Sequence, residues 1–422
     1  MHEKRELDMG LEMSTGALRV SSRRTPHHLP AIVAASCALL AAACGPVAER
    51  VPDIAIDSAG VQIVTSHPAD SDATCAISDE PTAAIGEDEG DETQWFSSIR
   101  GAGRLSDGSI VVVDRNSAEV RIYDEIGGHL RTMGRHGEGP GEFQDPFLLW
   151  ITAGDTLWVG DYRPWRYNLF TSQGEFVRQV NLTPILPNPP QLSGVLDNGY
   201  SLNASSKRAR NENFSVADTL MVLVYDPGGG LVGNLARIPD RTGGQVSDSD
   251  LWLFPLFQSF AEVDAGGSTV VLGHGSETEV RVLDDEFNLR LILRWTEPDR
   301  EVTSADVRAW REDYIARRSR LGEREWGEFD DARISPERPV AELFPAIGSI
   351  MIGRDGRIWI AQYDRPREDL GWLAFEPDGR FLCHLPARIP GSVREFGADY
   401  VLLQRESELG VQSVHLHRLE VP

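Results

Sequence analysis

The sequence predicts an all-β fold: a six-bladed β-propeller of four-stranded blades. Three observations predict this fold. One strand pattern recurs along the chain, the shortest copies have the length of a propeller blade, and a Gly-rich segment joins two copies. A short helical insertion is expected near residues 300–330, and an N-terminal signal and tether precede the propeller.

Residues 1–43 have the features of a signal peptide region. Two arginines precede an apolar run of about 15 residues, which is shorter than the roughly 20 that a membrane-spanning helix needs. The following "LAAACG" resembles a bacterial lipoprotein box, in which the cysteine, here Cys44, carries lipid and becomes the mature N-terminus. The resemblance implies a lipidated tether at 44–60 and export to the outer membrane, facing the periplasm or the cell surface. The alternative is an ordinary signal peptide cleaved near Ala43.

Residues 61–422 carry the repeat. Each copy has a turn, an apolar strand that ends in a polar residue, a second strand, a Gly turn and a third strand. The clearest copy is "LSDGSIVVVDRNSAEVRIYDEIGGHLRTMG", 105–134, in which Asp-Gly and Gly-Gly pairs mark hairpin turns. The first turns of the six copies lie at positions 107, 155, 198, 267, 355 and 398.

The spacing of these turns predicts where extra chain is inserted. The three short intervals are 48, 43 and 43 residues, which suits a four-stranded blade of about 40–50 residues. The two long intervals predict insertions at about 240–262 and 298–346. In the second insertion, "TSADVRAWREDYIARR" has apolar residues at helical spacing after a Thr-Ser cap, so we expect a helix that packs on one face of the disc.

The last copy lacks an outermost strand, whereas residues 61–86 have strand character and no copy of their own. We therefore expect the N-terminal segment to complete the final blade, which leaves only short, protected sheet edges. This closure brings Cys75 toward Cys383. The two cysteines form a disulfide in an oxidising compartment or remain two buried free thiols.

The formal charge of −24 restricts the partners. Acidic residues outnumber basic ones by 65 to 41, so nucleic acid and anionic lipid are repelled. We expect no nucleic-acid partner, and membrane contact only through the N-terminal lipid.

The segment "DGSIVVVDRNSAEVRIYDEIGGHLRTMGRHGEGPGEFQDP", 107–146, resembles an NHL repeat. That pattern has a strand ending in Asp, an Arg-containing strand, a third strand, and a Gly-rich loop with Phe and Pro. The ordered chain as a whole resembles bacterial six-bladed propeller lipoproteins. Its "GRHGEGPGEF", 134–143, lacks the Lys-Ser/Thr of a phosphate loop and is interpreted as a linker between blades, with Phe143 anchored in the wedge between them.

Polar residues at the ends of strands are the candidates for a site at one mouth of the channel. They are Asp114, Arg115, Asp161, Arg163, His274, Tyr363 and Asp364. Converging carboxylates bind a hard cation such as Ca²⁺, whereas alternating Asp and Arg pair with one another and bind nothing. The repeat-wide Asp of the NHL pattern favours pairing, so we expect no cofactor, with a channel-bound divalent cation as the alternative.

Two classes of function follow. The first is a non-enzymatic binding scaffold that recognises a protein, peptide or glycan through one face. The aromatic segments "WLFPLF", 252–257, and "RPWRY", 163–167, either form a recognition surface for it or, as we favour, fill space between blades. The second is a metal-dependent hydrolase or lyase of the gluconolactonase or NHL-lyase type. The sequence shows Asp candidates but no Glu–Asn partners for such chemistry, so it favours binding over catalysis and assigns no catalytic residue.

Overall fold

The computed structural model describes residues 53–86, 91–184, 191–207, 216–245, 252–297, 299–320, 326–386, 389–407 and 409–422. The predicted signal peptide region, Cys44 and most of the tether lie outside these ranges. Within them the chain is all-β: strands make up the body, together with two α-helices and the short 3₁₀ turns η1 (Pro68–Asp70) and η2 (Glu92–Gln94). None of the described helices is long and apolar enough to cross a membrane.

Three sheets have four antiparallel strands each, arranged in chain order as in a propeller blade. The first contains β5 (Ile99–Arg104), β6 (Ile110–Asp114), β7 (Glu119–Tyr123) and β8 (His129–Met133). The second contains β9 (Pro146–Thr152), β10 (Thr156–Asp161), β11 (Arg166–Phe170) and β12 (Phe176–Asn181). The third contains β22 (Ser349–Ile352), β23 (Ile358–Ala361), β24 (Trp372–Phe375) and β25 (Phe381–Leu385). The predicted propeller-like arrangement of four-stranded sheets is therefore present.

An eleven-stranded sheet contains two further four-stranded units. One is β13 (Gln191–Val195), β14 (Ser201–Lys207), β15 (Val216–Tyr225) and β16 (Leu231–Gln245), with β17 (Trp252–Leu253) at its edge. The other is β18 (Ala261–Gly266), β19 (Thr269–His274), β20 (Glu279–Asp284) and β21 (Leu289–Trp295).

The two units are joined by one parallel pair, Gly194 of β13 with Ala265 of β18. A Cβ at Gly194 would lie 2.4 Å from the Cβ of Ala265, so only glycine permits this approach. The hydrogen-bonded sheets consequently number five in the described chain, not the six that the sequence predicts.

The N-terminal segment takes two different places. Strand β4 (Ala83–Ile85) and strand β3 (Ala76–Ile77) pair with β28 (Gln412–Glu420), beside β27 (Tyr400–Glu406) and β26 (Ser392–Phe396). This pairing confirms that the N-terminal segment completes the last sheet. The earlier residues of this segment join a different sheet, the eleven-stranded one. There β2 (Val61–Ser66) pairs in parallel with β21, and β1 (Ile54–Ser58) pairs with β2 at the edge of the sheet.

A disulfide joins Cys75 and Cys383, whose Cα atoms are 5.5 Å apart. It ties the N-terminal segment to β25, 308 residues later. Both cysteines are fully buried in a cluster that also contains Trp359, Phe396 and Leu419. The disulfide therefore links the N-terminal segment to the β22–β25 sheet, which precedes the last sheet in the chain.

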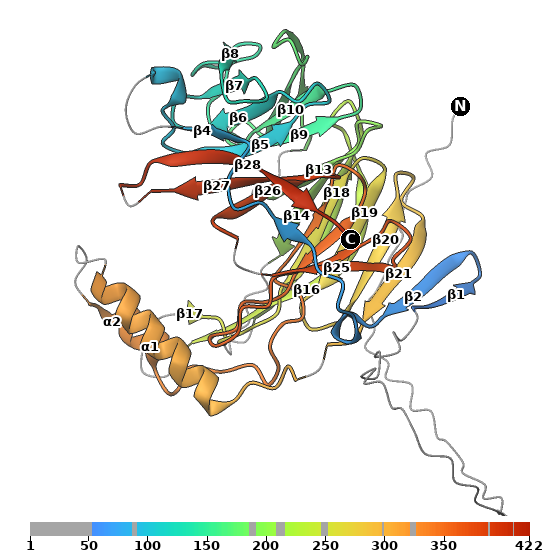
Figure 1. Cartoon of the computed structure of the whole chain (residues 1–422), viewed down its shortest axis with the longest axis vertical. Coiled ribbons are helices and arrows are strands. Elements are labelled where there is room, and N and C mark those ends of the chain that lie inside the picture. The colour runs from blue at the N-terminus through green and yellow to red at the C-terminus, as the bar shows by residue number, and fades with distance from the viewer. Residues whose placement is uncertain are drawn as a thin grey trace, which may run out of the picture.

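The two insertions pack against each other. Helix α1 (Ser304–Arg320) begins after Thr303, whose hydroxyl bonds Asp306, and α2 (Glu328–Ile334) follows it. Residues 254–257 of the first insertion meet residues 338–341 of the second: Leu256 N–H donates to Pro339 O at 2.8 Å and Ala341 N–H donates to Leu256 O at 2.9 Å. The helices lie away from the sheets of β5–β10 (Figure 1).

The core lies between neighbouring sheets. Val111, Val113 and Val120 pack with Ile151 and other apolar residues of the next sheet, and all of these side chains are buried. Phe143, fully buried in the same cluster, anchors the Gly-rich segment as predicted. Gly134 has a φ of 76°, and a Cβ there would lie 2.5 Å from the Phe143 ring. Glycine is therefore needed at this position for the backbone conformation and for the close approach of the ring.

Candidate functional site

The inner strands β5, β9, β13, β18, β22 and β26 lie side by side in this order, and β26 lies beside β5. They enclose a central cavity of about 670 Å³. Every one of the six contributes residues to its wall, as do the turns that follow β9, β13, β18 and β22. A cavity of this size lies within the range of about 300–1,000 Å³ that is usual for small-ligand sites.

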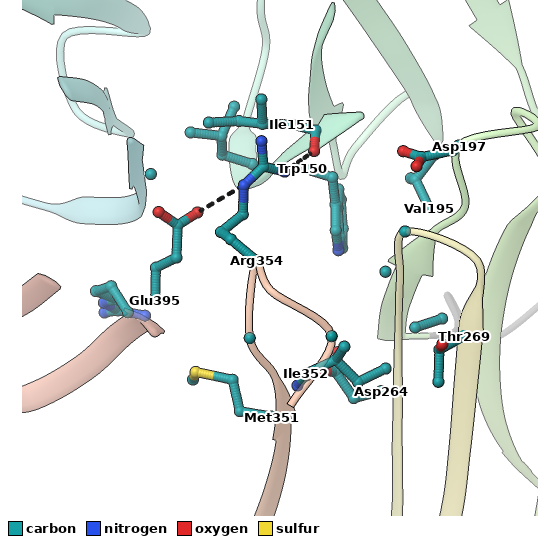
Figure 2. Close-up of a pocket in the computed structure, with 18 of the residues that line it drawn as sticks. Trp150, Ile151, Val195, Asp197, Asp264, Thr269, Met351, Ile352, Arg354 and Glu395 are labelled. Atoms are coloured by element: carbon teal, nitrogen blue, oxygen red, sulfur yellow. Dashed lines mark hydrogen bonds and ion pairs between the residues drawn. The ribbon is translucent and has the colours of Figure 1, made fainter. Parts of the chain in front are cut away.

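Arg354 crosses this cavity. It stands in the turn after β22, and one guanidinium Nη1 donates to the backbone carbonyl of Ile151 in β9, as Figure 2 shows. Strand β9 is three places from β22 in either direction around the ring, so the side chain reaches the opposite wall. Its Nε lies 4.0 Å from Glu395 Oε2, which is an ion pair but too long for a hydrogen bond.

Glu395 is fixed in place by its neighbours. Its Oε1 accepts the Arg104 N–H at 2.8 Å and the Tyr400 hydroxyl at 2.6 Å. Only 13% of its side chain is exposed, and this burial raises the pKa of the carboxyl. The Arg104 guanidinium in turn lies 4.8 Å from the centre of the Tyr400 ring. Two hydrogen bonds therefore hold Glu395 in place beside the Arg354 side chain.

Two carboxylates on another part of the wall have no basic partner within salt-bridge distance in the described chain. Asp264 of β18 accepts the Ile352 N–H at 2.7 Å, and burial raises its pKa to about 7. Asp197, in the turn after β13, accepts the Ala153 N–H at 2.7 Å and is exposed. In Figure 2 the Trp150 ring lies between Asp197 and Arg354. The cavity thus offers charges of both signs, an aromatic face and a carboxyl group that exchanges its proton near neutral pH.

The predicted channel-mouth residues lie elsewhere. Asp114 pairs across the sheet with Ile99, the first residue of β5, and Asp161 pairs with Pro146, the first residue of β9. The charged cavity residues Asp197 and Arg354 instead follow the last residues of inner strands. The two sets therefore lie at opposite ends of the inner strands.

Asp114 and Asp161 are already bonded within the protein. Asp114 is buried and accepts the Ser98 N–H at 2.9 Å. Asp161 is fully buried and accepts the Gln144 and Asp145 N–H groups and the Arg166 guanidinium, the last at 3.0 Å. With their oxygens directed at these donors, the two carboxylates do not fit the ligand set of a hard cation.

Arg115 and Arg163 converge on one carboxylate, Asp145. Arg115 forms a two-point ion pair with it, and Arg163 lies 3.8 Å away. The two predicted arginines therefore pair with an aspartate outside the predicted set, and not with Asp114 or Asp161.

His274, Tyr363 and Asp364 do not join that group. His274 Nδ1 is 2.6 Å from Ser276 Oγ, and burial lowers the pKa of this histidine. Tyr363 packs against Phe257 and Phe344 of the insertions, and Asp364 is exposed beside it. None of the seven predicted residues lines the cavity.

The aromatic segments fill space within the fold, which is the interpretation favoured from the sequence. Leu253, Leu256 and Phe257 are buried, as are Trp165 and Tyr167. Their side chains fill space between elements. Within the described ranges, no group of three or more His, Cys, Asp or Glu residues is arranged to hold a metal ion.

Sequence reasoning missed Asp197, Asp264, Arg354 and Glu395. Three of them stand in or next to the turns that join an inner strand to its neighbour, within "LDNG", "DAGG" and "GRDG". In the sequence these turns mark the repeat. The available signal was their position, because the turns that follow inner strands meet around one end of a propeller channel.

No family model matches the chain, and a search of curated proteins finds no match. Solved structures do resemble it. A protein from Bacteroides fragilis that is thought to be exported shares 10% identity at a TM-score of 0.48, covering 85% of this chain and 99% of that one. A DUF4221 family member from Bacteroides vulgatus shares 12% identity at a TM-score of 0.44, covering 83% and 100%. Virginiamycin B lyase from Staphylococcus aureus shares 9% identity at a TM-score of 0.35, covering 82% and 100%. Because every TM-score is below 0.5, these similarities carry no inference about activity.

Proposed function

We propose that the chain is an exported six-bladed propeller that binds a peptide or glycan in its central cavity. The blade count rests on taking β13–β16 and β18–β21 as two blades that touch through the single Gly194–Ala265 pair. Each of the six inner strands then begins one blade. The sequence features of residues 1–43 and Cys44 support export and a lipid anchor, and the Cys75–Cys383 disulfide is typical of an oxidising compartment.

One observation carries the binding function: a cavity of about 670 Å³ contains charged groups that the described residues leave wholly or partly unpaired. Asp197 and Asp264 bond only backbone N–H groups, and part of the Arg354 guanidinium has no partner among the described residues. Unpaired charges cost folding free energy when they are partly removed from water. A ligand with complementary polar groups recovers this cost on binding.

Filling the cavity tests the proposal. Gly266 lines the cavity, and a Cβ added there meets no atom within 4 Å, so Gly266→Phe occupies the space without backbone strain. Gly327, before α2, also has open space around a Cβ and lies outside the cavity, so Gly327→Phe is the matched control.

The measurement is the retention of two mixtures, random tripeptides and short oligosaccharides, by the immobilised full chain. We expect the wild type and Gly327→Phe to retain at least one mixture and Gly266→Phe to retain about tenfold less or lower. Equal retention by Gly266→Phe, or no retention by the wild type, would contradict the proposal.

A hydrolase or lyase is the second candidate, and one observation favours it. The carboxyl of Asp264 has a pKa of about 7 and lines a cavity, and a general base works best when its pKa is near the working pH. This candidate requires turnover of a lactone or ester by the wild type that Asp264→Asn abolishes. If the Asp264→Asn variant turns over the substrate as fast as the wild type, Asp264 is not a general base and this candidate is excluded.

A further inference from the structure

Arg354 lies on a different part of the cavity wall from Asp197 and Asp264. The other charged residues of the wall are already bonded: Asp355 to Arg357, Glu395 to Tyr400 and Arg394 to Gln404. The Arg354 side chain extends toward Ile151 and away from Asp264 (Figure 2). Asp264 belongs to β18, and Asp197 stands in the turn after the neighbouring strand β13. A ligand that satisfies both walls must itself carry a positive and a negative group.

The guanidinium of Arg354 has capacity for a ligand carboxylate. It has five N–H donors, of which Nη1 bonds Ile151 and Nε faces Glu395 at 4.0 Å. The remaining donors have no hydrogen-bond partner in the part of the chain that the structure describes. A guanidinium binds a carboxylate with two parallel hydrogen bonds, and these remaining donors of Arg354 can form them.

The two aspartates have capacity for a ligand ammonium group. Among the described residues, Asp264 is bonded only by backbone N–H groups, one of them from Ile352, and Asp197 only by that of Ala153. A carboxylate has about four acceptor positions, and an ammonium group has three donors. Trp150 also lines the cavity, and the face of an aromatic ring attracts a cation.

The size of the cavity sets the length of such a ligand. A sphere of 670 Å³ is about 11 Å across, which matches roughly three extended residues at about 3.5 Å each. We infer that the cavity binds short peptides by both free ends, with the carboxylate on Arg354 and the ammonium group on Asp197 and Asp264. This inference rests on the proposed binding function and narrows it to zwitterionic peptides.

Blocking each end of the peptide tests the inference on the wild-type chain. The immobilised full chain is exposed to random tripeptides with two free ends, to the N-acetylated mixture, to the C-amidated mixture and to short oligosaccharides. We expect retention of the free tripeptides and a loss of about tenfold or more on blocking either end, because each block removes hydrogen bonds to a charged group.

Variants assign each end to its partner. Arg354→Gln should remove the preference for a free carboxylate and keep the preference for a free amine. The double variant Asp197→Asn, Asp264→Asn should do the reverse. Arg163→Gln, with 72% of the Arg163 side chain exposed at the opposite end of the strands, should keep both preferences.

The outcomes separate this inference from the function on which it rests. Retention of tripeptides that is unaffected by blocking overturns the inference. Retention of oligosaccharides alone, lost in Gly266→Phe, overturns the inference and leaves the binding function intact. Retention of neither mixture overturns both.

Discussion

The two ends of the inner strands carry similar residue types in opposite circumstances. At the paired end, Asp161 is fully buried and bonds Arg166, while Arg115 and Arg163 share Asp145. At the cavity end, within the part of the chain that the structure describes, Asp197 and Asp264 bond only backbone N–H groups and Arg354 keeps free donors.

This difference shows that residue type after a strand does not identify a site. What distinguishes the two ends is whether each charge has found a partner within the protein. Charges that are mutually satisfied hold the fold together, whereas charges that face a cavity without a partner are available to a ligand. Substitutions at the two ends should therefore change stability in opposite directions.

The largest effect is expected at the paired end. Asp161→Ala leaves the Arg166 guanidinium buried without its carboxylate and frees two backbone N–H groups. Removal of one partner from a buried pair costs about 3–5 kcal/mol. Urea unfolding of the full chain should show this loss, and a change below about 1 kcal/mol would mean that Asp161 is not structural.

A smaller effect of opposite sign is expected at the cavity end. Burial raises the Asp264 pKa to about 7, from 3.8, so the folded state holds this proton more tightly than the unfolded state does. The stability that protonation contributes is complete below about pH 4 and is lost as the pH rises through 7.

Asp264→Asn cannot acquire the charge, so it should unfold at higher urea than the wild type at pH 8. The gain should exceed about 1.4 kcal/mol, the equivalent of one pKa unit, and should vanish near pH 4. Urea titrations at the two pH values measure it. Equal gains at both would show that Asp264 does not titrate in this range.

The smallest effect on stability is expected for Asp197→Asn. The side chain is exposed and has no ion pair in the described residues, and the asparagine oxygen can still accept the Ala153 N–H. Unfolding free energy should change by less than about 0.5 kcal/mol. A loss like that of Asp161→Ala would mean that the two ends do not differ.

The sequence was informative where local chemistry decides structure. The Asp107-Gly108 turn lies between β5 and β6 as expected, because Gly108 takes a φ of 93° and Asp107 accepts the Ser109 N–H. Phe143 is buried as predicted because a lone aromatic residue in a Gly-rich linker has few other places to pack. Helix α1 begins directly after Thr303, whose hydroxyl bonds Asp306 within the first turn, so its start also depends on residues close together in the sequence.

The sequence was not informative where partners are distant. Val61–Ser66 is a strand, but its partner β21 is more than 200 residues away along the chain. Strand character in the sequence does not show with which strand it pairs. Asp197 stands in a turn equivalent to that of Asp107, yet it bonds Ala153 of the neighbouring sheet. The merging of two units through Gly194 and Ala265 depends on one close backbone contact. Each of these features arises from how sheets meet around the ring.

The most direct measurement is a crystal structure of the chain grown with the tripeptide that it retains most strongly. The account predicts peptide density inside the cavity, with its carboxylate on Arg354 and its amine near Asp197 and Asp264. Density at Asp114 and Asp161, or on the outer surface with the cavity empty of peptide, would contradict it.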